Sequence, residues 1–153
     1  QVIKSDTFVY AGEKIKVRDL VYGALLASAN DAAKALGLAV SGTQKAFAKK
    51  MNAKAKKLGC TNTHFTNASG VYSNNQYSCA RDVAKIAKAA FANKDIRAIA
   101  GTAEYTVPAT NKTGQVKLKT TNLLLKGGTV DLPSGPVKVE EYDGVIAGKN
   151  GKY

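Results

Sequence analysis

Hydrophobic positions recur at helical spacing through the first hundred residues of the chain. Residues 19–27 form a mainly apolar run, and Asp19 at its start is a candidate N-cap. Ser28–Asp31 interrupts this run with residues that favour helix ends over helix interiors. A second helix is predicted from Ala32 to about Val40. The polar interruption therefore predicts a short loop between two helices, whose side chains point away from both.

Two longer amphipathic helices are predicted further along the chain. The first follows Ser41-Gly42-Thr43, which caps it, and Gly59 is a suitable stop. The second is expected to be capped by Ser78. Between them, residues 60–77 are rich in Asn, Thr, Ser and Gly without a sustained period, which is typical of a long irregular connection. The apolar stripes of the two helices are Phe47, Met51, Ala55 and Leu58, and Val83, Ile86, Ala87, Ala90 and Phe91.

Strand-like patterns lie mainly in the last third of the chain. Residues 105–107 and 116–120 are predicted to form two short strands around a polar turn, and residues 144–148 resemble the start of another. Residues 15–18 alternate with period two and predict an extended piece before the first helix. Helices followed by strands indicate the α/β (α+β) class in a single domain over residues 1–153.

The length and composition are those of one globular domain, with 153 residues of which 44% are hydrophobic. The chain is strongly basic, with 23 Lys and Arg against 11 Asp and Glu and a net charge of +12. We expect no nucleic-acid partner, because the charge is spread along the chain and no aromatic residues interleave with the lysines of residues 45–57. Attraction to an anionic cell wall or membrane surface is left open. No stretch approaches the roughly 20 apolar residues of a membrane span.

Histidine and cysteine are too few for most metal or nucleophile chemistry. His64 is the one histidine, and we expect it to be exposed or bonded to the backbone. The two cysteines do not lie at metal-ligand spacing, so no metal site is predicted. Cys60 and Cys79 flank the irregular connection, and two alternatives stay open. They are small apolar side chains when reduced, or a possible disulfide that would stabilise the fold by roughly 3 kcal/mol.

Ser28-Ala29-Asn30 stands out because of its setting, since Ser-x-Asn alone is a weak signal. Ser28-Ala29-Asn30 is one of a series of short segments along the chain, and Gly148-Lys149-Asn150-Gly151 is the last of them. In the residues and the order of these segments, the chain closely resembles the low-molecular-mass penicillin-binding proteins, which are serine-type D-alanyl-D-alanine carboxypeptidases of peptidase family S11. The resemblance implies a penicillin-binding protein/β-lactamase-like transpeptidase fold, mostly its helical region and part of its antiparallel sheet. The matching segments before the last are residues 12–13, 17–33, 51–55, 58–60, 63–67, 70–71, 77–84 and 120–124.

The resemblance also implies roles for individual residues. In that family Ser-x-x-Lys, Ser-x-Asn and Lys-Thr-Gly meet in one cleft, and the serine of the first motif forms an acyl-enzyme. By resemblance Ser28 relays a proton toward the leaving amine, and Asn30 holds the catalytic lysine and the substrate amide. Lys149 supplies positive charge toward the terminal carboxylate of the substrate. Asn150 and Gly151 are the candidate substrate-binding residues beside it.

The chain departs from the family pattern in two places. None of its serines is followed three residues later by lysine, so the nucleophile is expected to be absent from the chain. We accordingly expect a partial domain, truncated at both ends and inactive alone. The literal Lys112-Thr113-Gly114 is interpreted as a coincidence, because it lies in a predicted polar turn before residues 120–122. The positional match is Lys149-Asn150-Gly151, where Asn150 replaces the expected threonine.

The function expected from the resemblance is removal of the terminal D-alanine from peptidoglycan pentapeptide stems, outside the cytoplasm and without a cofactor. The expected partners are a stem peptide ending in D-Ala-D-Ala and, for the full-length enzyme, β-lactam antibiotics. The parent protein is expected to be membrane-associated. The alternatives are a β-lactamase-like or transpeptidase relative, or a non-catalytic peptidoglycan-binding module.

Overall fold

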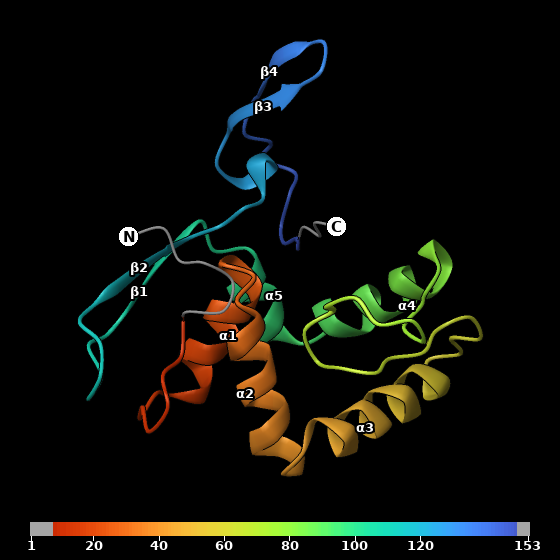
Figure 1. The fold of residues 1–153 in the computed structure, drawn as a ribbon. Helices are drawn as coiled ribbons and strands as arrows, with labels where there is room; N and C mark the ends of the chain where they lie inside the picture. Colours follow the sequence, from red (N-terminus) through yellow and green to blue (C-terminus); the bar gives the residue numbers. More distant parts are fainter. Residues whose placement is uncertain (1–7, 150–153) are drawn as a thin grey trace.

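The computed structural model describes residues 8–149 and confirms the order of helices followed by strands (Figure 1). A short 3₁₀ helix, η1 (Leu123–Leu125), separates two antiparallel hairpins. The helices are α1 (Val17–Leu26), α2 (Asn30–Ser41), α3 (Gln44–Lys57), α4 (Ala80–Phe91) and α5 (Lys94–Ala100). The strands are β1 (Glu104–Val107), β2 (Val116–Lys119), β3 (Gly128–Leu132) and β4 (Gly135–Val139).

The main core lies where α1, α2 and α5 meet the β1–β2 hairpin. The hairpin pairs Glu104 with Lys119 through to Val107 with Val116. Because strand side chains alternate between faces, Val107 and Leu118 are buried while the charged residues beside them face solvent. The buried members of the core are Phe8, Leu20, Tyr22, Leu26, Ala29, Ala32, Ile99, Val107 and Leu118. The loop between α1 and α2 thus lies directly on this core.

Several helix starts differ from the predictions. Residues 15–18 do not form a strand, since α1 begins at Val17 with Lys16 as its N-cap. Asp19 does not cap α1, because its carboxylate is buried inside the first turn and accepts a hydrogen bond from the Tyr105 hydroxyl at 2.6 Å. Tertiary packing therefore buries Asp19, although the local sequence favours this residue as a helix cap.

Two other helix boundaries also shift by one or two residues. Helix α2 begins at Asn30 rather than at Ala32. Cys79, not Ser78, is the N-cap of α4, because the Ser78 hydroxyl lies 2.9 Å from that of Thr63. The predicted start of α3 is confirmed, as the Thr43 hydroxyl accepts a hydrogen bond from the backbone amide three residues on.

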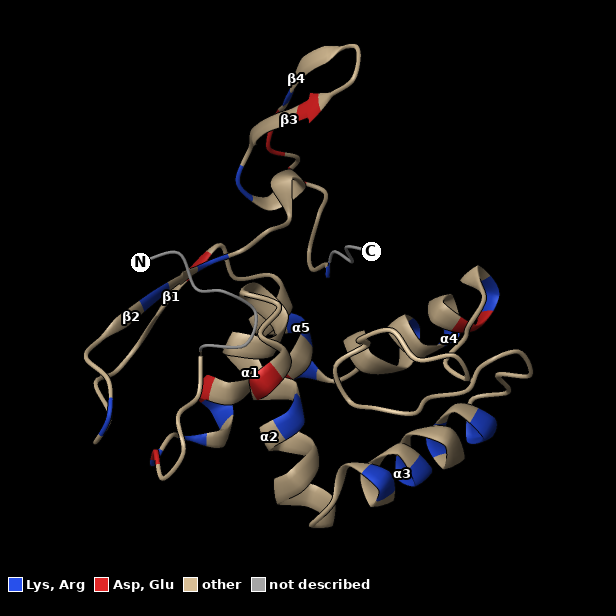
Figure 2. Cartoon of the chain, in the orientation of Figure 1, with Lys and Arg blue, Asp and Glu red and all other residues tan. Residues whose placement is uncertain are grey.

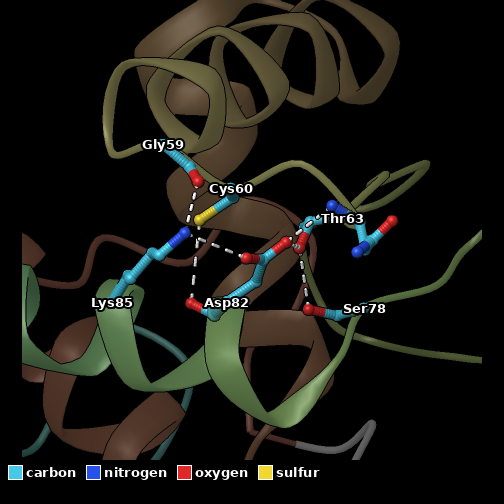
Figure 3. A network of polar contacts seen from close by, with 7 residues as sticks. Gly59, Cys60, Thr63, Ser78, Asp82 and Lys85 are labelled. Carbon is cyan, nitrogen blue, oxygen red and sulfur yellow. Dashed lines mark hydrogen bonds and ion pairs between the residues drawn. The ribbon is translucent and has the colours of Figure 1, made fainter.

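The irregular connection over residues 60–77 is confirmed, and a buried aspartate anchors it to α4 (Figure 3). Asp82 is 1% exposed and accepts hydrogen bonds from the Asn62 amide at 2.8 Å and the Thr63 hydroxyl at 2.9 Å. Lys85 lies 3.4 Å from its other oxygen. Burial opposes ionisation of Asp82, but these hydrogen bonds together hold its pKa below the usual range.

The last third of the chain holds both a wrong prediction and a missed element. Residues 144–148 do not form a strand; they turn back, and Val145 donates to the Tyr142 carbonyl at 3.0 Å. The β3–β4 hairpin was not predicted. Its signal was present, because apolar residues alternate on both sides of Pro133-Ser134-Gly135.

Charged residues are distributed over the whole molecule, with the lysines of α3 the most closely spaced (Figure 2). Among residues 8–149 there is no helix of the length and apolarity needed to cross a membrane.

Candidate functional site

Ser28 lies at the exposed turn between α1 and α2, held in an uncommon backbone conformation. Its φ is +55°, the only positive value at a non-glycine residue in the described part of the chain. Such a conformation costs roughly 1–3 kcal/mol and is found often at functional sites. The next residue, Ala29, is 1% exposed and donates its amide to the Gly23 carbonyl at 3.1 Å. The buried alanine thus fixes the turn, and the strained serine projects from it.

Asp31, directly after the Ser-x-Asn motif, ties the preceding chain to this turn. Its Oδ2 accepts hydrogen bonds from the amides of Phe8 at 2.6 Å and Val9 at 2.9 Å. Phe8 is buried against Gly23, where any side chain on the glycine would overlap the phenyl ring. Asn30, the first residue of α2, is half-buried between Ala29 and Asp31. The motif therefore lies on a support made by two helices and an extended segment.

Lys149 reaches Ser28 from the far end of the described chain. Its Nζ donates a hydrogen bond to Ser28 Oγ at 2.9 Å, across 121 positions of sequence. Desolvation lowers the pKa of Lys149, because burial disfavours the charged ammonium. A cation beside an exposed hydroxyl can attract an anionic group and can exchange protons with its neighbour. Asn150 and Gly151, the other candidate residues of this motif, lie outside the described residues.

Two glycines allow the backbone near Lys149 to approach the rest of the fold. Residues 144–149, here called the Lys149 segment, pass over the C-terminal end of α5, where Gly148 donates its amide to the Ala100 carbonyl at 3.4 Å. A side chain at Gly101 would overlap the Ile146 carbonyl, and one at Gly148 would overlap the Asn122 amide. A small residue is thus required at Gly101, where the overlap is with backbone, whereas at Gly148 the overlap is with the end of the Asn122 side chain.

The literal Lys112-Thr113-Gly114, here called the hairpin-tip segment, lies at a different place, at the tip of the β1–β2 hairpin. Thr113 Oγ1 donates to Glu13 Oε1 at 2.8 Å. Thr110 donates to the same oxygen at 2.5 Å. Burial opposes ionisation of Glu13, but these hydrogen bonds and one from the Tyr10 amide together lower its pKa. The polar turn expected for this segment is confirmed, and its threonine joins the hairpin to the chain before α1.

The histidine and the cysteines have structural surroundings. His64 is bonded to the backbone as expected, with Nδ1 2.6 Å from the Asn75 carbonyl. Both cysteines are free thiols, which is the reduced alternative. Burial raises the pKa of Cys60, whose Sγ lies 3.7 Å from the Asp82 carbonyl. No set of His, Cys, Asp and Glu within residues 8–149 is arranged to hold a metal ion.

Sequence reasoning missed the two carboxylates that brace this region. From the sequence, Asp31 was identified only as part of a polar interruption, and Glu13 was given no role. Their partners lie 22–23 and 97–100 positions away, so no local pattern marks them. The pairing of Asp31 with the Phe8 and Val9 amides has no signal in the sequence beyond the proximity of the aspartate to Ser28.

The chain is similar in sequence to proteins of one known family. The family model described as D-alanyl-D-alanine carboxypeptidase, peptidase S11, matches residues 2–134. The chain is similar to the D-alanyl-D-alanine carboxypeptidase of Streptomyces sp. strain K15, with 35% identity over 159 residues, 96% of this chain and 55% of the relative. It is also similar to the carboxypeptidase DacF of Bacillus subtilis, with 39% identity over 123 residues, 80% of this chain and 31% of the relative.

Solved structures show the same fold. A D-alanyl-D-alanine carboxypeptidase from Mycobacterium tuberculosis superposes with a TM-score of 0.72 and 32% identity, covering 87% of this chain and 53% of that one. A serine-to-alanine mutant of the Streptomyces K15 DD-transpeptidase gives a TM-score of 0.72 and 29% identity, covering 89% and 65%. The chain spans about half the length of the Streptomyces relative and a third of the Bacillus one. The chain belongs to the D-alanyl-D-alanine carboxypeptidase family, peptidase family S11.

Proposed function

We propose that this chain supplies two of the three motifs of a serine-type D-alanyl-D-alanine carboxypeptidase site. The reaction is removal of the terminal D-alanine from peptidoglycan stem peptides through a serine acyl-enzyme. The observation that carries the proposal is the 2.9 Å hydrogen bond from Lys149 to Ser28. It joins the Ser-x-Asn loop to the lysine that the family pattern pairs with it, although the two residues lie 121 positions apart.

The proposed chemistry follows from the groups that meet at this point. The terminal carboxylate of the substrate binds near Lys149, whose charge is worth more in a partly desolvated site than in water. Ser28, whose hydroxyl lies within hydrogen-bond distance of Lys149 Nζ, relays a proton toward the amine of the departing D-alanine. Asn30 holds the substrate amide beside it. Asn150 and Gly151 complete the carboxylate site in this proposal.

The acylated serine must come from a Ser-x-x-Lys segment, which the 153 residues do not contain. The chain by itself is therefore expected to leave nitrocefin intact and to remain unlabelled by fluorescent penicillin. Joined to such a segment, it is expected to form the acyl-enzyme. Because peptidoglycan lies outside the cytoplasmic membrane, the proposed site of action is extracytoplasmic, and β-lactams are the proposed inhibitors.

The test is a fusion protein in which the Ser-x-x-Lys region of the Streptomyces K15 relative precedes Gln1. We expect penicillin labelling and release of D-alanine from a pentapeptide, both lost in Ser28→Ala and retained in Ser134→Ala, a serine in the exposed turn between β3 and β4. A fusion protein that binds the pentapeptide without penicillin labelling or D-alanine release would instead indicate a non-catalytic peptidoglycan-binding module.

A second candidate reaction is transpeptidation, because one similar structure is named a DD-transpeptidase and its counterpart from the same strain a carboxypeptidase. The two reactions share the acyl-enzyme and differ in whether water or an amine accepts the acyl group. Adding glycylglycine to the fusion-protein assay separates them. Free D-alanine with a shortened peptide indicates hydrolysis, and a peptide extended by the acceptor indicates transpeptidation.

A further inference from the structure

Asp31 makes hydrogen bonds to distant backbone that helix capping alone does not require. Its Oδ1 accepts the Ala32 amide at 2.8 Å, which is a local bond in the first turn of α2. Its Oδ2 accepts the amides of Phe8 at 2.6 Å and Val9 at 2.9 Å, which lie 23 and 22 positions away in the chain. Hydrogen bonds to a carboxylate are stronger than those between neutral groups, so Asp31 holds residues 8 and 9 firmly against the start of α2.

The segment held by Asp31 places an aromatic ring against Gly23, a residue that also contacts the Ser28 turn. The ring is that of Phe8, which is 6% exposed and belongs to the main core. It lies so close to Gly23 that a Cβ atom on this glycine would overlap it. The Gly23 carbonyl accepts the Ala29 amide at 3.1 Å. Gly23 therefore touches both the ring that Asp31 positions and the residue that follows Ser28.

These contacts form a closed loop that constrains the backbone of Ser28. A positive φ at a residue other than glycine is strained, and it persists only where the surrounding structure determines it. The φ of Ser28 is +55°, and the closed loop supplies such a constraint from the chain that precedes α1. In the order of their contacts, the members of the loop are Asp31, Phe8, Gly23 and Ala29.

We propose that Asp31 is a positioning residue of the candidate site, which holds the Ser28 hydroxyl in place through Phe8. Asp31 itself binds neither the substrate nor Lys149 in this proposal, since it acts on the backbone that carries Ser28. Its effect on the reaction rests on the proposed function. Its effect on the conformation of the Ser28 turn does not, and that effect can be measured without any substrate.

Loss of the Asp31 carboxylate should impair the chemical step more than substrate binding. Asp31→Ala releases the Phe8 segment, so the Ser28 hydroxyl moves from the position in which it relays a proton. In the fusion protein we expect kcat for D-alanine release to fall about tenfold, with KM within about twofold. Rates are expressed per penicillin-labelled molecule, so unfolded protein does not count. A kcat in Asp31→Ala within about twofold of the unmodified fusion protein would contradict the proposal.

Asp31→Asn is the conservative variant that separates positioning from helix capping. Like Asp31→Ala, it removes the negative charge from the first turn of α2. The asparagine oxygen can still accept the Phe8 and Val9 amides, whereas its NH₂ group cannot accept the Ala32 amide. We expect urea unfolding to show lower stability but kcat to stay within about threefold of the unmodified fusion protein. If kcat fell as far as in Asp31→Ala, the effect would come from capping or charge and the proposal would be wrong.

Phe8→Ala tests whether Asp31 acts through the aromatic ring. This variant keeps the carboxylate and both backbone amides that bind it. We expect the same fall in kcat, about tenfold, and the double variant should be no slower than either single variant. Losses that multiply in the double variant would show that the two residues act separately, against the proposal. Where Asp31→Ala yields no folded protein, Phe8→Ala decides the question in the same assay.

Amide hydrogen exchange in the 153-residue chain measures the Ser28 turn itself. In Asp31→Ala the Ala29 amide should exchange about tenfold faster than in the unmodified chain, relative to the amides of α3. Tyr105→Phe is the control, because it lowers stability at the hydrogen bond to Asp19 and should leave this ratio unchanged. An unchanged ratio in Asp31→Ala would overturn the proposal. If the unmodified fusion protein releases no D-alanine, the proposed function fails, and the exchange ratio alone decides the role of Asp31.

Discussion

Two segments of the chain are candidates for the third motif of the family, Lys112-Thr113-Gly114 and Lys149-Asn150-Gly151, and the structure gives their lysines different surroundings. The hairpin-tip segment is tied to the chain before α1, through the 2.8 Å hydrogen bond from Thr113 to Glu13. Lys149 instead extends to the strained turn at Ser28, 2.9 Å away. The hairpin-tip segment, which has the family's Lys-Thr-Gly sequence, thus braces the fold. The Lys149 segment, which is followed by asparagine in place of the threonine, contacts the Ser-x-Asn motif.

The two segments also differ in how firmly the fold holds them. The β1–β2 hairpin is fixed near its base by Tyr105, which stacks on Tyr22 at 3.5 Å and donates to the buried Asp19. Its tip is fixed by Glu13. The Lys149 segment is held mainly by close backbone approach at Gly101 and Gly148. A substitution at the hairpin should therefore change stability, and one at the Lys149 segment should change chemistry.

The largest expected effect is that of Lys149→Ala on the fusion protein. Loss of one charge-assisted hydrogen bond to the substrate carboxylate should lower kcat/KM about 10- to 100-fold, mainly through KM. Lys112→Ala is the matched control and should stay within twofold, because its segment lies at the hairpin tip. Initial rates of D-alanine release measure both. Equal losses in the two variants would contradict the assignment of Lys149 to the site.

Tyr105→Phe should give the next largest effect, on stability rather than activity. It leaves the Asp19 carboxylate buried without the phenol that donates to it, which costs about 2 kcal/mol. The hydrogen bond to Asp19, burial and the nearby negative charge raise the pKa of Tyr105 to about 12. The unfolded chain releases this proton near pH 10, so the stabilisation is complete below pH 10 and is lost as pH rises toward about 12.

Urea unfolding of the chain at several pH values measures this difference. The gap between the unmodified chain and Tyr105→Phe should narrow from pH 9 to pH 11. Tyr72→Phe, at a tyrosine that is 86% exposed, is the control and should change stability by less than about 0.5 kcal/mol. A pH-independent gap would show that the hydrogen bond to Asp19 does not cause it.

Helices α1 to α4 were predictable because each carries its own signal in the sequence. The apolar stripe and Thr43 cap of α3 are local features, and both were confirmed. Asp19 was wrongly predicted as a cap because its partner, Tyr105, lies 86 positions away. A residue type that favours helix caps can instead be buried in the core when a hydrogen-bond donor distant in sequence, here the Tyr105 hydroxyl, satisfies its carboxylate.

The candidate site depended on the resemblance more than on spacing. Nothing local to Lys149 indicates that it approaches Ser28, since the two residues lie 121 positions apart with two hairpins between them. The literal Lys112-Thr113-Gly114 would have been the choice from letters alone. Its interpretation as a coincidence rested on its predicted turn, and that turn is confirmed. The Asp31 bridge was beyond prediction because it uses backbone amides, which every residue except proline carries.

Gly101→Ala tests whether backbone approach holds the Lys149 segment in place. The added methyl group would overlap the Ile146 carbonyl, so the Lys149 segment must shift. None of the residues of that segment is itself changed by the substitution. We expect about a fivefold loss of kcat/KM in the fusion protein, since small displacements of a binding group reduce activity. Gly114→Ala, in the hairpin-tip segment, has open space around it and should change nothing. Full activity in Gly101→Ala would show that Lys149 does not need this approach.

Glu13→Gln should have the smallest effect, and it tests the structural side of the comparison. The amide keeps an acceptor for Thr110 and Thr113 but loses the charge, so stability should fall by about 1 kcal/mol at pH 7. The folded pKa of Glu13 is lowered, so its stabilisation is present above the unfolded value of 4.5 and is lost as pH falls through the folded value. Urea unfolding of the two proteins should therefore converge in acid.

Activity provides the second half of this last test. The fusion protein with Glu13→Gln should keep its kcat/KM within twofold, because Glu13 braces the hairpin tip and not the Ser28 turn. Glu140→Gln, at a carboxylate that is 75% exposed, controls for the loss of one negative charge. If Glu13→Gln lowered kcat/KM as far as Lys149→Ala does, the hairpin tip and the Ser28 turn would be one coupled unit. If it lowers stability alone, the two lysine-glycine segments are separate in function as they are in space.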